Sequence, residues 1–335
     1  MDEYYQGEVP GVSDAGIEVS GLAKAYGKVV ALESVSFTVA AGTVCGLLGP
    51  NGSGKTTTVS ILSTALRPDE GSARVCGFDV VADAAAVRSV VGLAGQFAAV
   101  DANLSGRENL ALIGRLSRLG RRSARERAGE LLEGFGLTEA ADRLVRTYSG
   151  GMRRRLDVAA ALAHRPPVLF MDEPTAGLDP ESRFALWEIL RQLVAGGTTV
   201  LLTTQYLEEA DALADQVVII DAGRVVEVGT PTALKARVGA VVFSLGFTDD
   251  DAAAQAAGVL AGAGHRPERD GTALRVRAAG GSAALVGVLR ALEGSAPEPT
   301  SVGVREPSLD DVFLALTGKA PVTPAGRDER KRGAA

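Results

Sequence analysis

The glycine-rich turn at Gly49–Thr57 constrains the fold of this chain more than any other stretch. It reads Gly-Pro-Asn-Gly-Ser-Gly-Lys-Thr-Thr and stands between an apolar run, Thr43–Leu48, and a helical run, Lys55–Leu66. In a strand, turn and helix of this pattern, backbone N–H groups converge on one point, and the helix directs its positive dipole end there. A glycine turn with a chance lysine is the alternative, but the three elements occur in the required order. The stretch predicts a phosphate cradle in which Lys55 reaches the β- and γ-phosphates of a nucleotide and Thr56 binds Mg²⁺.

The composition is typical of a soluble protein. With 335 residues, of which 46% are hydrophobic and 23% charged, the chain can bury a full core and form two or three compact units. Its net charge of −6 argues against nucleic acid as the main partner. No stretch reaches the roughly 18–20 consecutive apolar residues that cross a bilayer, and acidic Asp2 and Glu3 do not suit a secretory leader. We therefore expect a cytosolic chain that spans no membrane.

The cysteines and histidines predict neither a disulfide framework nor a zinc site. Cys45 precedes the cradle in an expected strand and Cys76 falls in another, so each is interpreted as a small core residue. His164 and His265 are the only histidines, too few for a zinc-type cluster. A nucleotide with Mg²⁺ is therefore the ligand that the sequence predicts.

Short apolar runs alternate with helical patterns along most of the chain. Ile17–Val19 and Val35–Val39 alternate apolar and polar residues, which predicts a small antiparallel sheet before the cradle. Later strands are expected at residues 73–78, 91–94, 168–171, 199–204, 217–220 and 225–228. With helices between them, these strands predict an α/β fold with a mostly parallel sheet.

The expected helices differ in character. Leucines at helical spacing among many arginines and glutamates over Arg107–Arg146 predict a helical insert, whose bounds we place at about residues 97–160. Other helices are expected at 84–90, 153–164 and 182–194. The last of these is expected to bury Phe184, Trp187, Leu190 and Val194.

Polar residues follow several of these elements. Asp172 and Glu173 come directly after the apolar strand at 168–171, and Gln205 follows the strand at 199–204. An open α/β sheet places ligand chemistry at the C-terminal ends of its strands, which favours a catalytic role over a pair of surface acids. Ser149, Gly150 and Gly151 precede a helix, where the serine suits an N-cap and the glycines admit a ligand to the backbone.

A domain boundary is expected after Val238, where a helix that starts at Thr230 and Pro231 ends. Beyond it, strands at 241–247, 273–277 and 302–305 alternate with helices at 252–260, 283–292 and 309–316. These elements suffice for a small α+β domain over residues 239–318. Residues 1–15 and 319–335 are expected to be disordered tails.

Six motifs in order resemble those of the ATP-binding cassette (ABC) ATPases. They are the cradle, Gln96, Ser149-Gly150-Gly151, Asp172-Glu173, Gly177-Leu178-Asp179 and Gln205. The resemblance covers about Ile17–Leu234 and implies that residues 16–238 form an ABC ATP-binding domain with a P-loop core, an antiparallel β subdomain and a helical insert. The ending at Glu306–Gly318 and the stretch Thr203–Asp211 further resemble the daunorubicin-resistance type of drug-export ATP-binding subunit.

The resemblance implies a role for each matching residue. Tyr26 stacks on adenine, Thr56 and Gln96 approach Mg²⁺, Asp172 binds the metal through water, and Glu173 polarises the attacking water. Ser149 and Gly151 complete the ATP site of a second copy of the chain across a dimer interface. The residues so implied in nucleotide binding are Tyr26, Asn51, Gly52, Ser53, Gly54, Lys55, Thr56, Thr57, Gln96, Ser149, Gly150, Gly151 and Asp179.

The chain departs from the family pattern at two motifs. The signature begins with Tyr148 and ends with Met152 where the family commonly has Leu and Gln, and we expect little effect. Gln205 stands where most relatives carry a histidine that contacts the γ-phosphate. Glutamine keeps a donor and an acceptor but cannot become cationic. Our hypothesis is that Gln205 still orients the γ-phosphate and water, with Lys55 and Glu173 as the other catalytic residues.

The resemblance also implies partners. Two copies would sit under a separate membrane permease, peripherally at the cytoplasmic face of the membrane, and ATP would close them head to tail. Coupling would pass near Gln96 and the segment 97–109, although an ordinary connecting loop is the alternative. Drug efflux is the first choice of function; export of a lipid or polysaccharide, or action on a soluble complex, is the alternative.

Overall fold

The computed structural model describes residues 15–95, 100–238, 241–278, 283–294, 297–305 and 307–318. The expected disordered tails, apart from Ala15, and the predicted ligand Gln96 lie outside these ranges. Two compact units divide between Pro231 and Thr232. The units therefore separate at the start of the helix whose end, at residue 238, marks the boundary expected from the sequence.

A six-stranded sheet forms the centre of the first unit. Its order is β10-β9-β3-β8-β7-β6, and all neighbouring strands are parallel except the hairpin of β9 and β10. The strands are β3 (Val44–Leu48), β6 (Val91–Ala94), β7 (Val168–Asp172), β8 (Thr199–Thr204), β9 (Gln216–Asp221) and β10 (Arg224–Gly229). This arrangement confirms the α/β fold class.

A second, antiparallel sheet of order β2-β1-β4-β5 precedes and follows the cradle in sequence. Its strands are β1 (Ala15–Tyr26), β2 (Val29–Ala40), β4 (Glu70–Val75) and β5 (Phe78–Asp79). The single strand expected at 73–78 is wrong, because Cys76 and Gly77 both have positive φ angles, 49° and 79°, and turn the chain between β4 and β5.

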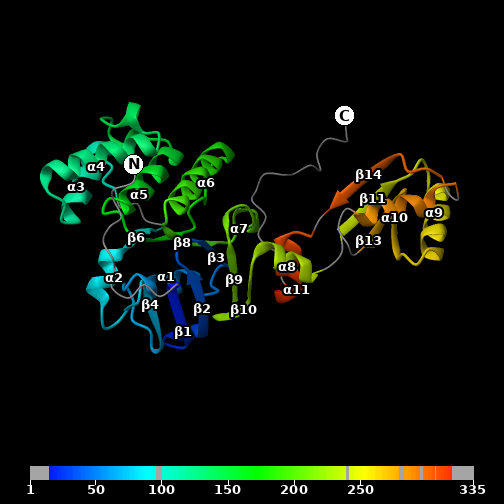
Figure 1. The fold of residues 1–335 in the computed structure, drawn as a ribbon, viewed down its shortest axis with the longest axis horizontal. Helices are drawn as coiled ribbons and strands as arrows, with labels where there is room; N and C mark the ends of the chain where they lie inside the picture. Colours follow the sequence, from blue (N-terminus) through cyan, green and yellow to red (C-terminus); the bar gives the residue numbers. More distant parts are fainter. Residues whose placement is uncertain are drawn as a thin grey trace. The chain divides into compact units, whose positions relative to one another are not determined.

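Two hydrophobic cores lie on opposite faces of the parallel sheet, and Figure 1 shows the elements that cover each face. On one face, the antiparallel sheet packs with α1 (Lys55–Leu62) and α2 (Ala84–Val90). The other face carries α3 (Gly106–Leu116), α4 (Arg121–Gly134), α5 (Gly150–Ala161) and α6 (Pro180–Ala195). Along β7, Val168 and Phe170 enter the first core while Leu169 and Met171 enter the second. Period-two alternation therefore explains why this strand is apolar throughout.

Phe184 of α6 is not buried as expected, and Val194 is only half buried. Leu190 is fully buried and Trp187 almost so, whereas Phe184 is 58% exposed. At about 100° per residue, Phe184 lies roughly 120° around the helix from Leu190 and so leaves the buried stripe. Its ring instead packs edge to face on Trp187, with centroids 5.3 Å apart.

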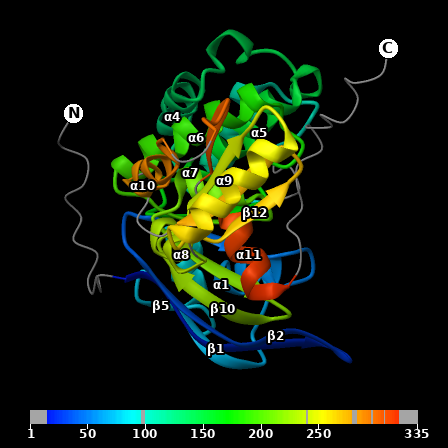
Figure 2. The same ribbon diagram turned by 90° about the vertical axis from the view of Figure 1, so that its right-hand side faces the viewer.

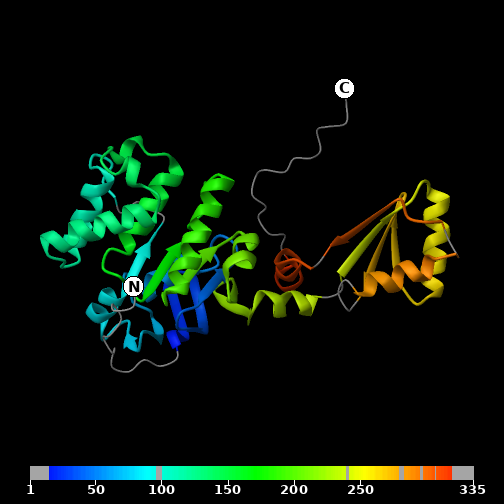
Figure 3. The same cartoon turned by 45° about the horizontal axis from the view of Figure 1, so that its top comes forward.

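The second unit contains an antiparallel sheet of order β12-β13-β11-β14. Helices α9 (Asp250–Gly262) and α10 (Ala283–Leu292) pack on it around the fully buried Phe243, and Figure 2 shows α9 lying across the strands. In Figure 3 both helices lie on the same side of the sheet. The strands are β11 (Val241–Gly246), β12 (Pro267–Asp270), β13 (Ala273–Ala278) and β14 (Ser301–Arg305); α8 (Pro231–Val238) and α11 (Leu309–Thr317) flank them in sequence.

Cys45 provides a chemical test of the central sheet. Its side chain is fully buried in β3, and burial raises the pKa of its thiol to about 12, whereas Cys76 is only half buried. Since the thiolate is the reactive form, we expect Cys76→Ala protein, which keeps only Cys45, to resist Ellman's reagent at pH 8 until guanidinium unfolds it. Cys45→Ala protein is the control and should react while folded. Equal native rates for the two variants would contradict the buried position of β3.

Candidate functional site

The loop between β3 and α1 forms the expected cradle. Gly52 and Gly54 have φ angles of +81° and +109°, in the region that favours glycine. A side chain at Gly49 would place its Cβ 2.2 Å from the carbonyl oxygen of Ile220, and one at Gly54 would lie 2.7 Å from that of Ala31. The glycines are therefore required by backbone conformation and by close packing of the loop against neighbouring strands.

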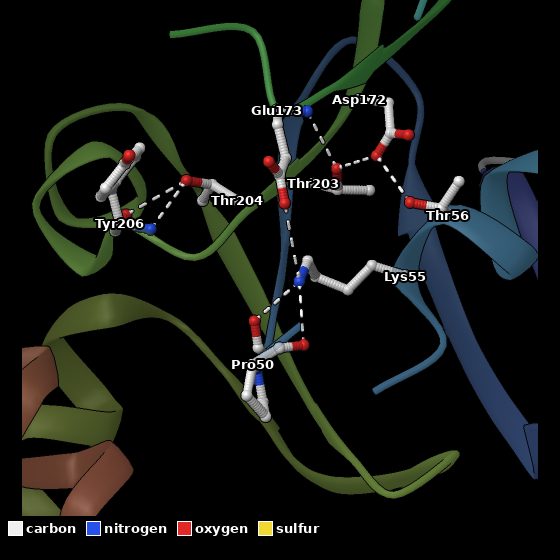
Figure 4. A network of polar contacts seen from close by, with 9 residues as sticks. Pro50, Lys55, Thr56, Asp172, Glu173, Thr203, Thr204 and Tyr206 are labelled. Atoms are coloured by element: carbon white, nitrogen blue, oxygen red, sulfur yellow. Dashed lines mark hydrogen bonds and ion pairs between the residues drawn. The ribbon is translucent and has the colours of Figure 1, made fainter. Parts of the chain in front are cut away.

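Lys55 begins α1 and is only 5% exposed. Its Nζ donates to the carbonyl oxygens of Gly49 at 2.8 Å and Pro50 at 3.1 Å, and lies 4.0 Å from Oε1 of Glu173 (Figure 4). Burial lowers the pKa of Lys55, while the charges of Glu173 and Asp172 act in the opposite direction. The cradle thus holds a partly desolvated cation close to two carboxylates.

Asp172 and Glu173 leave the end of β7 as expected. Asp172, 5% exposed, accepts hydrogen bonds from the hydroxyls of Thr203 and of Thr56, the latter at 3.3 Å (Figure 4). The backbone N–H of Glu173 donates to both the carbonyl and the hydroxyl oxygen of Thr203, each at 3.1 Å. Glu173 has a φ of +48°, which is uncommon for a residue with a long side chain. Thr203 therefore fixes both acidic residues.

The sequence pattern does not single out Thr203 as a functional residue, although it begins the stretch Thr203–Asp211 that resembles drug-export subunits. Its position in β8 supplies the missing signal, because β8 is parallel to β7 and pairs Thr203 with Asp172. A hydroxyl in that register reaches the carboxylate on the next strand. Sequence alone shows the two strands but not that they are neighbours.

Ser149 and the two glycines after it start α5. The Ser149 hydroxyl caps the helix by accepting from the N–H of Met152 at 3.2 Å. Gly150 is exposed, with open space around its Cα, whereas a Cβ on Gly151 would lie 2.1 Å from the hydroxyl oxygen of Ser182. That hydroxyl donates to Asp179, which caps α6. Ser182 thus lies against Gly151 and hydrogen-bonds to Asp179.

The structure brings together Lys55, Thr56, Asp172 and Glu173 from the predicted set. Tyr26, at the end of β1, is 52% exposed, and Gln205 is half buried directly after β8. Within the described ranges, no hydrogen bond or ion pair links Ser149, Gly150 or Gly151 to the cradle. These residues lie on the helical layer, so the chain by itself presents two separate groups of predicted ligands.

Thr56 and Asp172 offer two oxygen donors beside the cradle. No cluster of three or more His, Cys, Asp or Glu side chains suited to a metal occurs among the described residues. Two protein oxygens nevertheless fit Mg²⁺, which is commonly bound by one or two carboxylates together with phosphate oxygens and water. The donor set therefore suits a metal that arrives with a nucleotide.

Comparison with known proteins identifies the family. A model of the ABC transporter family matches residues 32–176. The daunorubicin resistance ATP-binding protein DrrA3 of Streptomyces coeruleorubidus is 51% identical over 307 residues, which cover 92% of this chain and 97% of that protein. The chain belongs to the ATP-binding proteins of ABC transporters. It is thus a nucleotide-binding ATPase, and the resemblance drawn from its motifs is confirmed.

Two further similarities extend this result. The Nod factor export ATP-binding protein I of Ralstonia nicotianae is 41% identical over 94% of this ABC protein and 98% of its own length. Among solved structures, a dimeric post-hydrolysis state of an ATP-binding cassette bound to ADP and Pi matches with a TM-score of 0.59 and 25% identity, covering 64% of this chain and 98% of that one. In the described part of this chain, no helix is long and apolar enough to cross a membrane.

Proposed function

We propose that this ABC ATPase drives efflux of a drug or hydrophobic antibiotic through a separate membrane protein, at whose cytoplasmic face it is bound. The observation that carries the proposal is the 51% identity to a daunorubicin resistance protein, which extends over 97% of that protein's length. The similarity therefore includes the C-terminal unit as well as the cassette. A membrane partner is required because the work of transport needs a pathway across the bilayer.

The cradle supplies the nucleotide site in this proposal. Residues 51–57 hold the phosphates through backbone N–H groups, and Lys55 turns its Nζ from the Gly49 and Pro50 carbonyls to phosphate oxygens. The exposed ring of Tyr26 stacks on adenine. Thr56, Asp172 and Gln96 hold Mg²⁺, which when bound supplies positive charge that stabilises the phosphates.

Glu173 is the residue that we assign to water activation. Its carboxylate is held near Lys55, and its backbone is fixed by Thr203, so the group is positioned before any water arrives. A carboxylate accepts a proton from water as the nucleophile attacks, while Lys55 and the cradle stabilise charge on the phosphoryl group. Positioning and electrostatics thus account for the chemistry without a covalent intermediate.

Two copies of the chain complete each site in this proposal. Ser149 and Gly150 are exposed at the N-terminus of α5, where free N–H groups and the helix dipole favour an anion. Their separation from the cradle of the same chain supports a γ-phosphate contact in a second copy, arranged head to tail with Asp179 near the interface. The ADP-bound structural relative is dimeric, which supports pairing of two copies.

Co-purification tests the transport proposal. The chain would be co-expressed with the membrane protein encoded beside it, isolated as a complex in nanodiscs, and assayed for ATPase activity with and without daunorubicin. Drug stimulation that is absent in a Glu173→Gln complex supports efflux. A stable complex stimulated by lipid or oligosaccharide but by no drug would assign a different cargo, and failure of any membrane protein to co-purify would contradict transport.

Export of a lipid or polysaccharide is the second candidate. The similarity to a Nod factor export protein over 94% of this chain favours it, because that relative aligns over nearly its whole length and is named for a different cargo. The nanodisc assay separates the two candidates directly. Action on a soluble complex, the remaining alternative, predicts no membrane partner at all.

The Gln205→Ala variant tests whether Gln205, which stands after β8 where most relatives have a histidine, contributes to turnover. Because Gln205 is proposed to orient the γ-phosphate and water without carrying charge, we expect kcat to fall by about tenfold, less than the roughly 10²–10⁴-fold typical of acid–base groups. Steady-state ATPase assays check this, with Gln192→Ala on the exposed side of α6 as the matched control. An unchanged kcat in Gln205→Ala would remove this residue from the site.

A further inference from the structure

Arg154 makes three hydrogen bonds to backbone carbonyls outside its own helix. It lies on α5, five residues after the Ser149 cap. Its Nη1 donates to Gly95 at 2.6 Å, its Nε to Pro174 at 2.8 Å, and its Nη2 to Asp172 at 3.2 Å. The planar fork of a guanidinium carries donors in fixed directions, so a single side chain can hold three separate peptide groups.

The three acceptors mark the two strand ends that carry predicted ligands. Gly95 directly follows β6 and immediately precedes Gln96. Asp172 ends β7, and the carbonyls of Asp172 and Pro174 belong to the residues on either side of Glu173. Arg154 therefore hydrogen-bonds to the backbone on both sides of the proposed catalytic carboxylate. It also hydrogen-bonds to the residue that precedes Gln96.

The conformation of Glu173 needs such support. A long side chain at φ +48° occupies a sparsely populated backbone region, which persists where the surroundings determine it from several directions. Thr203 fixes the N–H of Glu173, and Arg154 fixes the two flanking carbonyls. Without Arg154, the backbone of Glu173 keeps its bonds to Thr203 and the bond from the N–H of Ala176 to its own carbonyl. The flanking Asp172 and Pro174 carbonyls, however, lose the guanidinium.

The helix that carries Arg154 also carries the signature residues. Five residues of α-helix span about 7.5 Å along the axis, so the backbone of Arg154 is a little more than one turn from that of Ser149. Burial lowers the pKa of Arg154 against the opposing charges of Asp157, Asp172 and Glu209. The partly desolvated Arg154 thus links the exposed start of α5 to the buried end of β7.

We propose that Arg154 is a positioning residue that places Glu173 for water activation and couples its position to the signature end of α5. The coupling part rests on the function proposed above, because it requires a nucleotide in the second copy to contact Ser149 and Gly150. Displacement of α5 at that contact then shifts the Asp172 and Pro174 carbonyls with it. Small misplacements of a catalytic group cost up to about a hundredfold in rate.

The neighbouring arginines provide matched controls. Arg153 is exposed, and the Nη1 of Arg155 donates to the carbonyl of Phe135 at the end of α4, within the helical insert. All three arginines lie on one helix and have the same charge. Only Arg154 reaches the ends of β6 and β7, so only its replacement is expected to affect turnover strongly.

The test compares Arg154→Gln, Arg153→Gln and Arg155→Gln in the full purified chain with MgATP. Nucleotide binding is titrated with a fluorescent ATP analogue, so that kcat is expressed per occupied site and misfolded protein is not counted. We expect Arg154→Gln to lower kcat about 10- to 100-fold with KM within threefold of the parent, and the two controls to stay within twofold. Arg154→Lys, with one ammonium in place of the fork, should recover only part of the loss.

A double-mutant cycle with Glu173→Gln decides how Arg154 acts. If Arg154 works through Glu173, Arg154→Gln adds no more than a twofold loss in the Glu173→Gln background. Three results would each overturn the proposal. They are losses of kcat in the two single variants that multiply in the double variant, an unchanged kcat in Arg154→Gln, and a loss of nucleotide binding in Arg154→Gln that parallels its loss of kcat. The assay contains no membrane protein or drug, so an error in the proposed cargo would leave its result unaffected.

Discussion

Glu173→Gln is expected to lower ATPase kcat by about 10²–10⁴-fold, the range for removal of a general base. Glutamine fills the same space and keeps the backbone bonds to Thr203, so the site should stay assembled while its amide cannot accept a proton. Nucleotide binding should therefore survive, and the proposed dimer should accumulate with ATP because it is not hydrolysed. Steady-state kinetics and size-exclusion chromatography with and without MgATP measure the two effects.

Glu188→Gln is the matched control for this substitution. Glu188 lies on α6 with its side chain 61% exposed and pairs with Arg191 at the surface. Exposed pairs of this kind contribute little, so the control should keep parental kcat and the parental oligomeric state. Full activity in Glu173→Gln would contradict the assignment of water activation to this carboxylate.

Lys55→Met is expected to weaken ATP binding by about 10- to 100-fold, since hydrogen bonds to charged groups contribute roughly 1.5–3 kcal/mol. Methionine retains the aliphatic part of the buried side chain but removes the Nζ that we place on the phosphates. Isothermal titration with ATP, and with a non-hydrolysable analogue, would measure the change. Parental affinity would contradict the phosphate contact of Lys55.

Lys55→Met should also fold, and this separates a binding defect from a folding defect. Burial lowers the pKa of Lys55, which means that the folded protein disfavours its charged form. An apolar replacement removes the desolvation cost of that buried charge, although Glu173 and Asp172 lose a nearby cation. The melting temperature without nucleotide is therefore expected to stay close to that of the parent, and only the increase on ATP addition should become smaller.

Much of the fold was predictable because its signals are local. The glycine-rich turn, the apolar strand before Asp172 and the alternation in β1 and β2 each follow from a few adjacent residues. The same holds for the cap at Ser149, which the structure confirms. Helix α7 (Leu207–Leu213) and strand β12 received no assignment, since α7 is short and β12 is polar and mostly exposed.

The parts that sequence did not predict depend on contacts between distant segments. Thr203 reaches Asp172 only because β8 lies beside β7, and Arg154 reaches Gly95 across 59 residues of chain. Arg154 looks in sequence like one of three consecutive arginines on a helix surface. Nothing in the one-dimensional pattern distinguishes it from Arg153 and Arg155, whereas the three-dimensional partners do.

The unlike surroundings of Gly150 and Gly151 have a consequence for genetic surveys of this protein. Gly151 has no room for a Cβ beside Ser182, so a substitution there should reduce how much folded protein a cell retains. Gly150 has that room, and a substitution there should leave protein abundance normal while abolishing drug resistance. A saturation screen scored by growth in the drug would report both glycines as equally intolerant, and only a parallel screen scored by abundance would tell apart the two causes.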